Sequence, residues 1–346
     1  MPDLDEIKKY LREYDGDAKV IMEVCGTHTA SISENGIPAM LSDKIKLISG
    51  PGCPVCVTVA SYIDRLIELS LEENTTVVTF GDMLRVKGSE KSLSEAMADG
   101  ASVKMVYSPF EILDMAEENE TILYVFAAVG FETTTPVYAL ITDELLKRDT
   151  KNVKLLTALK TMPEAIRTVA NGDTKITGFL APGHVSTITG HKLFENMAME
   201  LNIPFVTAGF KGEELLAAIY ALTKLDGGKS LNMYPSVVTY EGNKAAKEMV
   251  SKYFVACDAA WRGMGVIKNS GMRLRDEYKR FDAGSAMLTE DKMYNRGCAC
   301  GEVICGKKNP NECQLYGKVC TPDNPQGACM VSTEGSCFHY YINRRR

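Results

Sequence analysis

The segment that most limits how this chain can fold is 298–337, because it holds seven of the eleven cysteines. Glycine and proline are scattered between these cysteines, as in Thr321-Pro322 and Asn324-Pro325. A segment with so few large apolar side chains cannot bury enough apolar surface to fold alone. Cross-links must therefore stabilise it, and disulfides, structural zinc and an iron–sulfur cluster are the three candidates.

The rest of the chain favours metal binding over disulfides. The first residues contain neither the basic nor the apolar region of a secretory signal, and no run approaches the roughly 18 apolar residues of a membrane span. We therefore expect a cytoplasmic protein, where clustered cysteines more often bind metals or perform redox chemistry than form disulfides. The segment has no CxxC pair of the kind that zinc favours. Its open spacing, Cys-x12-Cys-x6-Cys-x16-Cys, suits an iron–sulfur cluster at least as well as zinc.

Length and charge set further limits. A chain of 346 residues predicts two or three domains, at roughly 150 residues each. The net charge of −6 and the single tryptophan argue against nucleic-acid binding, which needs basic surfaces and aromatic stacking.

Strand-like runs alternate with amphipathic helical patterns over most of the chain, which predicts an α/β fold with parallel sheets. The pattern begins again near residue 121, so we expect two related parallel-sheet α/β domains, 15–120 and 121–255, facing a cleft. A C-terminal cysteine-rich module is expected over 256–346, and residues 1–14 form a helix that can pack on it.

Polar and sulfur-containing residues gather where predicted strands end, which is where open α/β sheets place their functional sites. Two such groups follow strands of the first half, and two follow strands of the second. We expect the loops to converge if the two domains face each other. The candidate residues are Cys25, His28, Cys53, Cys56, Glu132 and His184.

The cysteines of the first half have more than one interpretation. Cys53 and Cys56 form a CxxC sequence before a predicted helix, where the helix dipole lowers a thiol pKa. Such a pair is a redox dithiol or half of a metal site. Cys25 and His28 can ligate iron or zinc, or act as nucleophile and base, and the alternative is a pair of inert buried residues.

The candidates of the second half are individually weaker. Glu132 can orient a ligand or move a proton, and capping of the following helix is the competing interpretation. His184 gains weight because Pro182-Gly183 precedes it, as Pro51-Gly52 precedes Cys53. The sequence has no Walker A loop and no GxGxxG pattern, so nucleotide use is not indicated.

Taken together, these segments resemble the HypD family of hydrogenase maturation factors. The resemblance extends over nearly the whole chain. The matching segments are Cys25-Gly26-Thr27-His28-Thr29, Gly50-Pro51-Gly52-Cys53-Pro54-Val55-Cys56, Gly130-Phe131-Glu132-Thr133-Thr134, Ala181-Pro182-Gly183-His184-Val185-Ser186 and Gly327-Ala328-Cys329-Met330-Val331-Ser332, with the spaced cysteines of the tail.

The resemblance implies a particular cofactor. In this family a C-terminal module carries one [4Fe-4S] cluster, which here implies cluster ligation by Cys300, Cys313, Cys320 and Cys337. The family's cluster site is likened to that of ferredoxin:thioredoxin reductase, where a cluster supplies electrons to a nearby disulfide. By this likeness Cys298 and Cys329 are a neighbouring redox pair, and Cys305 has no assigned role.

The resemblance also implies a function, a scaffold on which the Fe(CN)2CO unit of [NiFe]-hydrogenases is built. The partners implied are a HypC-type small chaperone and a HypE-type cyanide donor. A transient Fe(II) carrying CN and CO would be held by Cys25, His28, Cys53 and Cys56. The sequence does not decide whether such a scaffold is an enzyme. The rival interpretation, an iron–sulfur thiol–disulfide oxidoreductase acting on protein disulfides, leaves His28 and His184 without a role.

Overall fold

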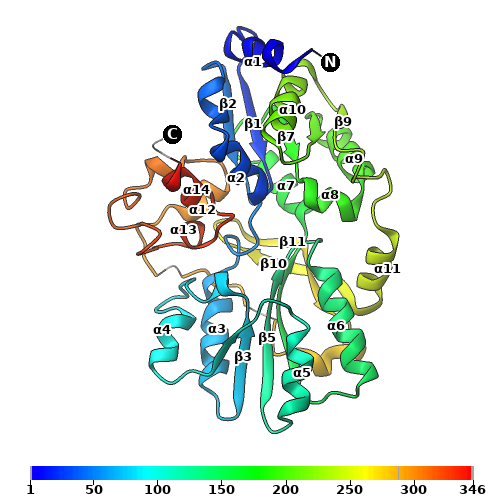
Figure 1. Cartoon of the computed structure of the whole chain (residues 1–346), viewed down its shortest axis with the longest axis vertical. Helices are drawn as coiled ribbons and strands as arrows, with labels where there is room; N and C mark the ends of the chain where they lie inside the picture. Colours follow the sequence, from blue (N-terminus) through cyan, green and yellow to red (C-terminus); the bar gives the residue numbers. More distant parts are fainter. Residues whose placement is uncertain (1, 287, 293, 344–346) are drawn as a thin grey trace.

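The computed structural model describes residues 2–286, 288–292 and 294–343. It contains two sheets, one toward each end of an elongated molecule (Figure 1). The first sheet has the strand order β2-β1-β7-β8-β9 and the second has the order β10-β11-β6-β5-β3-β4. All pairs are parallel except β10 with β11 and β11 with β6.

The strands of the first sheet are β1 (Lys19–Glu23), β2 (Ile45–Ser49), β7 (Gly178–Ala181), β8 (Phe205–Thr207) and β9 (Ser230–Asn232). Those of the second sheet are β3 (Thr75–Thr79), β4 (Val103–Met105), β5 (Leu123–Gly130), β6 (Val153–Lys160), β10 (Phe254–Trp261) and β11 (Gly265–Leu274). The inner strands are apolar along their length because a parallel sheet is covered on both faces, and seven of the eight residues of β5 are buried. The expected α/β class is confirmed.

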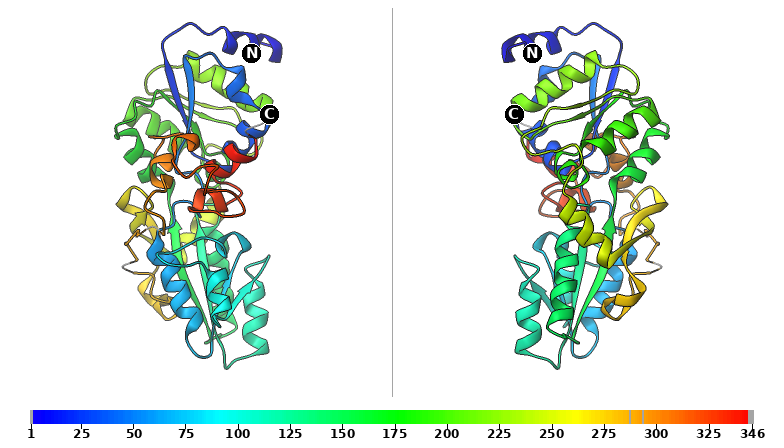
Figure 2. Two further views of the ribbon diagram at one scale, coloured as in Figure 1. Left: turned by 90° about the vertical axis from the view of Figure 1, so that its left-hand side faces the viewer. Right: turned by 90° about the vertical axis from the view of Figure 1, so that its right-hand side faces the viewer.

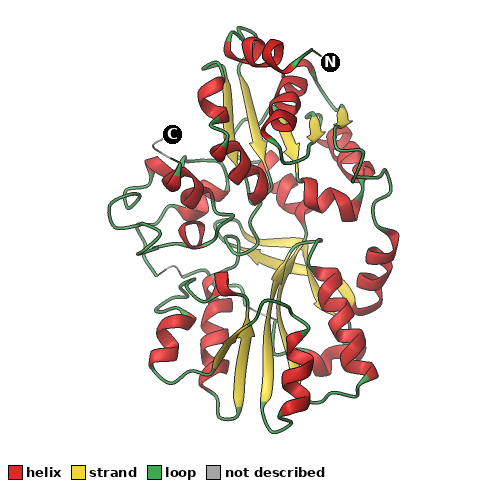
Figure 3. Ribbon diagram, in the orientation of Figure 1, coloured by secondary structure: helices red, strands yellow, loops and turns green. Residues whose placement is uncertain are grey.

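Helices lie on both sides of the sheets (Figure 3). They are α1 (Leu4–Arg12), α2 (Gly26–Glu34), α3 (Ala60–Leu71), α4 (Leu93–Ala98), α5 (Glu111–Glu118), α6 (Thr135–Lys147), α7 (Met162–Ala170), α8 (Gly183–Thr189), α9 (His191–Leu201), α10 (Gly212–Lys224), α11 (Lys244–Tyr253), α12 (Cys300–Ile304), α13 (Ala328–Val331) and α14 (Ser336–Ile342). Among the described residues, no helix combines the length and the apolar character that crossing a membrane requires.

The strand pairing does not follow the predicted division into 15–120 and 121–255. Strands β1 and β2 pair with β7 and its neighbours, whereas β3 pairs with β5 in the other sheet. The chain therefore crosses from the first sheet to the second after β2 and returns after β6. Local periodicity shows that a strand exists, but the partner of that strand depends on long-range packing.

The predicted start of the C-terminal module is also wrong. Residues 254–274 form the β10–β11 hairpin, which extends the second sheet through the pairing of Gly271 with Lys160. Nor do residues 1–14 pack on the module, because α1 lies on α10, where the rings of Tyr10 and Tyr220 are 4.9 Å apart. The apolar face of an amphipathic helix shows that it packs, but not on what.

The cysteine-rich segment lies beside α2, at the level between the two sheets (Figures 1 and 2). The hydroxyl of Ser33 on α2 donates to the carbonyl of His339 on α14 at 3.1 Å. From the hairpin, the buried guanidinium of Arg262 donates to the carbonyl of Thr58 and forms an ion pair with Asp291 at 3.3 Å. Gly263 in the turn of the hairpin lies directly against the segment, because a Cβ there would be 2.4 Å from the Cα of Gly301. The segment is thus held between elements of both sheets, as its lack of an apolar core requires.

The first sheet combines strands from distant parts of the sequence, and this arrangement can be tested. Phe179 on β7 and Phe205 on β8 are fully buried, with ring centroids 4.7 Å apart. We expect Phe179→Ala to lower the free energy of unfolding by about 3–5 kcal/mol, because it leaves a cavity in the core. The matched control Met199→Ala, at a side chain 60% exposed, should change it by less than about 0.5 kcal/mol. Equal losses in urea unfolding would contradict the central position of β7.

Candidate functional site

Three of the predicted loops leave neighbouring strands of one sheet. Cys25 follows β1, the loop with Cys53 follows β2, and His184 follows β7, and β1 lies between the other two strands. The loops meet because the carboxyl ends of parallel strands share one sheet edge. Their convergence was predicted, but from two facing domains. The loops in fact converge because they follow three neighbouring strands of one sheet.

A close backbone contact joins the first two loops. The N–H of Gly26 donates to the carbonyl of Gly52 at 3.1 Å, and a Cβ on Gly52 would collide with the backbone of Cys25. A Cβ on Gly26 would likewise collide with Glu334 of the C-terminal segment. Only glycine allows these three segments to approach so closely.

Cys25 is buried immediately before α2, with 6% of its surface exposed. Burial raises the pKa of its thiol to about 12, and backbone N–H contacts from His28 oppose this only in part. The carboxyl groups of Glu23 and Glu334 raise the thiol pKa further. Cys25 is therefore a protonated thiol at neutral pH until a cation displaces its proton.

Cys53 and Cys56 are joined by a disulfide, with their Cα atoms 5.2 Å apart, and both are buried. The predicted helix begins only at Ala60, so the CxxC sequence lies in the turn before α3 and not at its first turn. The N–H of Cys56 lies 3.2 Å from the sulfur of Cys53, and the hydroxyl of Ser332 lies 3.4 Å from the same sulfur. The last contact brings the C-terminal segment directly against the disulfide.

His28 lies on α2, within a segment expected to be a loop, and it is completely buried. Its Nε2 faces the carbonyls of Ala208 and Gly209 at 3.3 and 3.1 Å, so Nε2 carries the proton. Nδ1 then keeps its lone pair, and it is buried without a hydrogen-bond partner among the described residues. Burial lowers the pKa of His28 to about 4, so the ring is neutral. Only Nδ1 is available to a metal ion.

His184 stands at the start of α8, exposed, with its ring stacked on Phe210 at 4.2 Å. The hydroxyl of Thr27 lies 3.4 Å from its Nδ1 and 3.5 Å from the carboxyl group of Glu334. These contacts connect the loop after β7 with α2 and with the C-terminal segment. His184 therefore belongs to the same group of loops as Cys25.

Glu132 follows β5 in the other sheet. Its Oε1 accepts a hydrogen bond from the N–H of Met162 at 2.8 Å, so Glu132 caps α7 and not the helix that follows it in sequence. Its Oε2 is buried without a partner in the described part of the chain. Burial raises the pKa of Glu132 to about 7, which suits a group that exchanges protons near neutral pH.

Glu23 is a site residue that sequence reasoning missed. It ends β1, is 3% exposed, and accepts hydrogen bonds from the N–H of Cys25 at 3.1 Å and the hydroxyl of Thr29 at 2.5 Å. Burial raises the pKa of its carboxyl group to about 8. A single carboxylate inside the apolar run Val20-Ile21-Met22-Glu23-Val24 was the available signal, because a buried acid needs a reason.

Six cysteines of the C-terminal segment line a single cavity. Gly327 also lines it, and a Cβ there would lie 2.6 Å from the sulfur of Cys298. The backbone N–H of Gln326 points at the sulfur of Cys320 at 3.4 Å. The six cysteines are Cys298, Cys300, Cys313, Cys320, Cys329 and Cys337.

Within this cavity Cys300 occupies the centre of a chain of thiols. Its sulfur lies 3.0 Å from that of Cys329, and contacts with Cys298 and then Cys329 lower the pKa of Cys300 well below its usual range. The same contacts raise the pKa values of Cys298 and Cys329. The predicted redox pair is thus two free thiols, each against Cys300, and their direct exchange stays a prediction.

One cysteine lines two sites. Cys329 borders the cavity of the six cysteines and also a small pocket with Cys53 and Cys56. In the described part of the chain, no three His, Cys, Asp or Glu side chains surround a single point as a metal ion requires. The predicted metal ligands Cys25, His28, Cys53 and Cys56 therefore do not converge on one position. What the structure does bring together is the disulfide and the cysteine cavity, which share Cys329.

Comparison with known proteins defines the class. The family model HypD, described as "Hydrogenase formation hypA family", matches residues 3–344. The chain belongs to this family of hydrogenase maturation factors.

Individual relatives cover nearly the full length. A putative hydrogenase expression/formation protein of Methanocaldococcus jannaschii is 39% identical over 347 residues, covering 99% of this chain and 96% of the relative. The hydrogenase maturation factor HypD of Azotobacter vinelandii and that of Escherichia coli are each 38% identical, with 94% of this chain and 89% of the relative covered.

The buried carboxyl group of Glu23 should make the free energy of unfolding depend on pH, which can be tested. Its folded-state pKa of about 8 lies above the usual 4.5, so its contribution to stability is complete below about pH 4.5 and is lost as the pH rises to 8. Glu23→Gln removes this titration. We expect the variant to exceed the wild type in free energy of unfolding by about 4 kcal/mol at pH 8, but by little at pH 4.5.

The measurement is urea unfolding across this pH range, with Glu73→Gln at an exposed position as the matched control. The control should follow the wild-type profile throughout. A Glu23→Gln profile parallel to that of the wild type would contradict a neutral buried carboxyl group.

Proposed function

We propose that this protein is a cytoplasmic maturation scaffold for [NiFe]-hydrogenase, on which CN and CO ligands are attached to iron to form the Fe(CN)2CO unit. One observation supports it most directly, the position of Cys329 between the Cys53–Cys56 disulfide and the cavity of six cysteines. Hydrogenase maturation is the function in the names of the relatives. The geometry supports the proposal by placing the six-cysteine cavity beside the loops of Cys25 and Cys53.

The set of donor atoms around the cavity suits a [4Fe-4S] cluster. Its soft thiols are the ligands that such clusters take, and the N–H of Gln326 directed at Cys320 resembles the hydrogen bonds that surround cluster sulfurs. Gly327 keeps the space between Cys298 and Cys300 free of a side chain. Cys300, Cys313, Cys320 and Cys337 would hold the cluster, which when bound supplies single electrons.

Cys298 and Cys329, which are not cluster ligands in this proposal, carry out a dithiol–disulfide exchange with Cys53–Cys56. Cys329 attacks one sulfur of the Cys53–Cys56 bond, so a new S–S bond forms while the old one breaks and the released thiolate takes a proton. Cys298 then attacks the mixed disulfide. Cys53 and Cys56 are then thiols. Cys298 and Cys329 have lost the two electrons that reduced the first disulfide, and a new disulfide joins them.

The reduced CxxC pair and Cys25 then receive iron as a substrate. Thiolates are the ligands that suit low-spin Fe(II) carrying CN and CO, and burial at Cys25 excludes water. Iron binding expels the thiol proton of Cys25 to solvent, because the buried carboxyl group of Glu23 next to it already carries its own proton at neutral pH. The lone pair at Nδ1 of His28 is a further donor, and Glu132 and His184 serve as proton-transfer or orienting groups.

The proposal includes partners. A HypC-type small chaperone would complete the iron ligands, and a HypE-type protein would deliver cyanide. The alternative function, a thiol–disulfide oxidoreductase of protein disulfides, is supported by the same Cys329 geometry. It gives no role to the neutral His28 or to the group of His184 and Thr27.

Infrared spectroscopy tests the scaffold. We expect the anaerobically purified protein with its small chaperone partner to show CN and CO stretching bands. Cys25→Ala should lose these bands because the iron loses a thiolate, and Cys305→Ala should keep them. A wild type that contains a cluster but shows no such bands would favour the disulfide oxidoreductase.

Differential alkylation tests the exchange. After anaerobic reduction with dithionite, Cys53 and Cys56 of the wild type should become thiols. In Cys329→Ala this reduction should be slower by about tenfold or more, because the attacking thiol is missing. Cys298→Ala should trap the mixed disulfide, and Cys305→Ala should behave as the wild type. Equal rates of Cys53–Cys56 reduction in all four proteins would rule out the exchange.

A further inference from the structure

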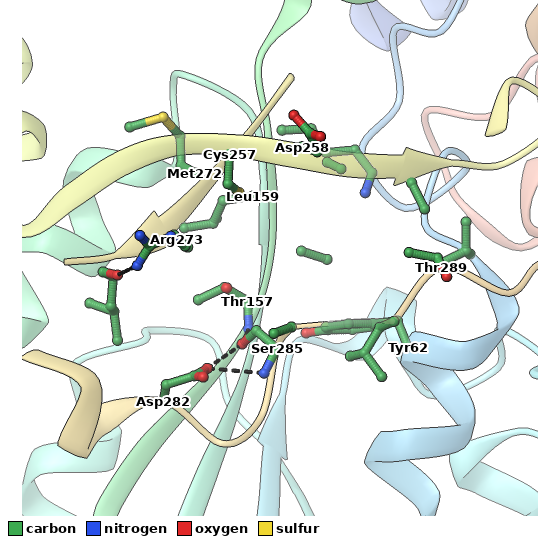
Figure 4. Close-up of a pocket in the computed structure, with 18 of the residues that line it drawn as sticks. Tyr62, Thr157, Leu159, Cys257, Asp258, Met272, Arg273, Asp282, Ser285 and Thr289 are labelled. Carbon is green, nitrogen blue, oxygen red and sulfur yellow. Dashed lines mark hydrogen bonds between the residues drawn. The ribbon is translucent and has the colours of Figure 1, made fainter. Parts of the chain in front are cut away.

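A further pocket lies between β6, the β10–β11 hairpin, the start of α3 and residues 282–286 and 288–289 (Figure 4). Its volume is about 380 Å³, which is within the range of small-molecule sites. Apolar side chains such as Leu159, Met272 and Leu274 form much of its lining. The maturation chemistry described above uses none of these residues.

Three strands place a lysine and a cysteine together in this pocket. Lys160 on β6 pairs with Gly271 on β11, and Gly271 pairs with Cys257 on β10. Residues opposite one another on neighbouring strands project to the same face of a sheet. Gly271 between them has no side chain, so Lys160 and Cys257 share one face of the sheet with no side chain separating them. Both line the pocket, and the charge of each acts on the pKa of the other.

Lys160 is a buried cation without a counter-ion. It is 4% exposed, and no hydrogen bond or ion pair is recorded between its Nζ and the described residues. The ring of Trp261 lies 5.7 Å from it, and the charges of Cys257 and Asp291 act on it only from a longer range. Burial lowers the pKa of its amine to about 8. A buried ammonium group without a partner is costly, so an anion that enters the pocket is strongly favoured.

The acidic groups around the pocket are already engaged. Asp282 accepts hydrogen bonds from the N–H and hydroxyl of Ser285, as the dashed lines of Figure 4 show. Asp276 forms an ion pair with Arg273 at 2.8 Å, and Asp258 accepts from the N–H of Asn269 at 3.0 Å. Asp291, the carboxylate whose charge acts on Lys160, is itself paired with Arg262 at 3.3 Å. Lys160 therefore remains available to a ligand.

We propose that this pocket binds a small organic carboxylate, whose anionic group pairs with Lys160 next to Cys257 and whose apolar part contacts Leu159 and Leu274. A single buried cation balances one negative charge, which fits a carboxylate better than a phosphate dianion. The exposed side chain of Lys279 at the pocket margin attracts anions toward it.

Alkylation of Cys257 tests the proposal, because iodoacetate is itself a small carboxylate and iodoacetamide is its neutral counterpart. In the reaction the thiol sulfur forms a bond to carbon, iodide leaves, and the thiol proton passes to solvent. The full-length protein is treated with each reagent, and peptide mass spectrometry gives the rates at Cys257 and at the half-buried Cys305 as an internal standard.

The expected result is a ratio of iodoacetate to iodoacetamide rates that is about tenfold higher at Cys257 than at Cys305, which corresponds to one charged hydrogen bond. Lys160→Met, with similar volume and no charge, should abolish the difference, whereas Lys279→Met should retain most of it. Circular dichroism confirms that both variants are folded. Equal ratios at the two cysteines, a difference that survives in Lys160→Met, or no reaction at Cys257 would overturn the proposal.

Competition identifies the anion. Acetate should slow the reaction of iodoacetate at Cys257 in the wild type, while chloride at the same ionic strength should not. If inorganic phosphate competes as well as acetate, the assignment to a carboxylate is wrong.

Discussion

The arrangement of the site depends on the backbone contact between Gly26 and Gly52. Strands β1 and β2 bring their loops together only because a hydrogen bond of 3.1 Å links these residues and no Cβ intervenes. The same contact leaves room for Glu334, so the cysteine-rich segment docks where the two loops meet. Cys25, the disulfide and the cysteine cavity are therefore positioned by one steric condition. Larger residues at either glycine would separate all three.

Burial keeps the groups around this contact neutral. Removal from water raises the pKa values of Cys25 and Glu23 and lowers that of His28, which are the directions in which each group loses its charge. A site of neutral thiol, acid and imidazole repels neither a metal ion nor an anionic ligand before binding. Once a cation arrives, the same low polarity strengthens its attraction to a thiolate. In the proposed scaffold, the cost of ionising Cys25 would be offset by the iron and not by the protein.

Much of this arrangement was predictable from the sequence, because its signals are local. Strand–loop alternation gave the α/β class, and the positions of Cys25 and Cys53 at strand ends gave their place at the edge of a sheet. The partners of the strands were not predictable, since β1 pairs with β7 over more than 150 residues of intervening chain. His28 was expected on a loop and lies on α2, because a Gly-Thr-His-Thr run has weak local preferences that tertiary packing overrides. Glu23 was overlooked because its partners, Thr29 and the N–H of Cys25, become adjacent only when the chain turns into α2.

The β10–β11 hairpin connects the two chemical regions of the molecule. One part of it faces the carboxylate pocket through Cys257 and Gly271, and its turn carries Arg262, whose positive charge helps to lower the pKa of Cys300 in the cysteine cavity. The guanidinium of Arg262 also lies near Lys160 and lowers its pKa. A ligand carboxylate at Lys160 would offset part of the positive charge that Cys300 experiences. Occupancy of the proposed pocket would thereby be coupled to the electrostatics of the cysteine cavity through one buried guanidinium, and by the reciprocity of linkage each would affect the other equally.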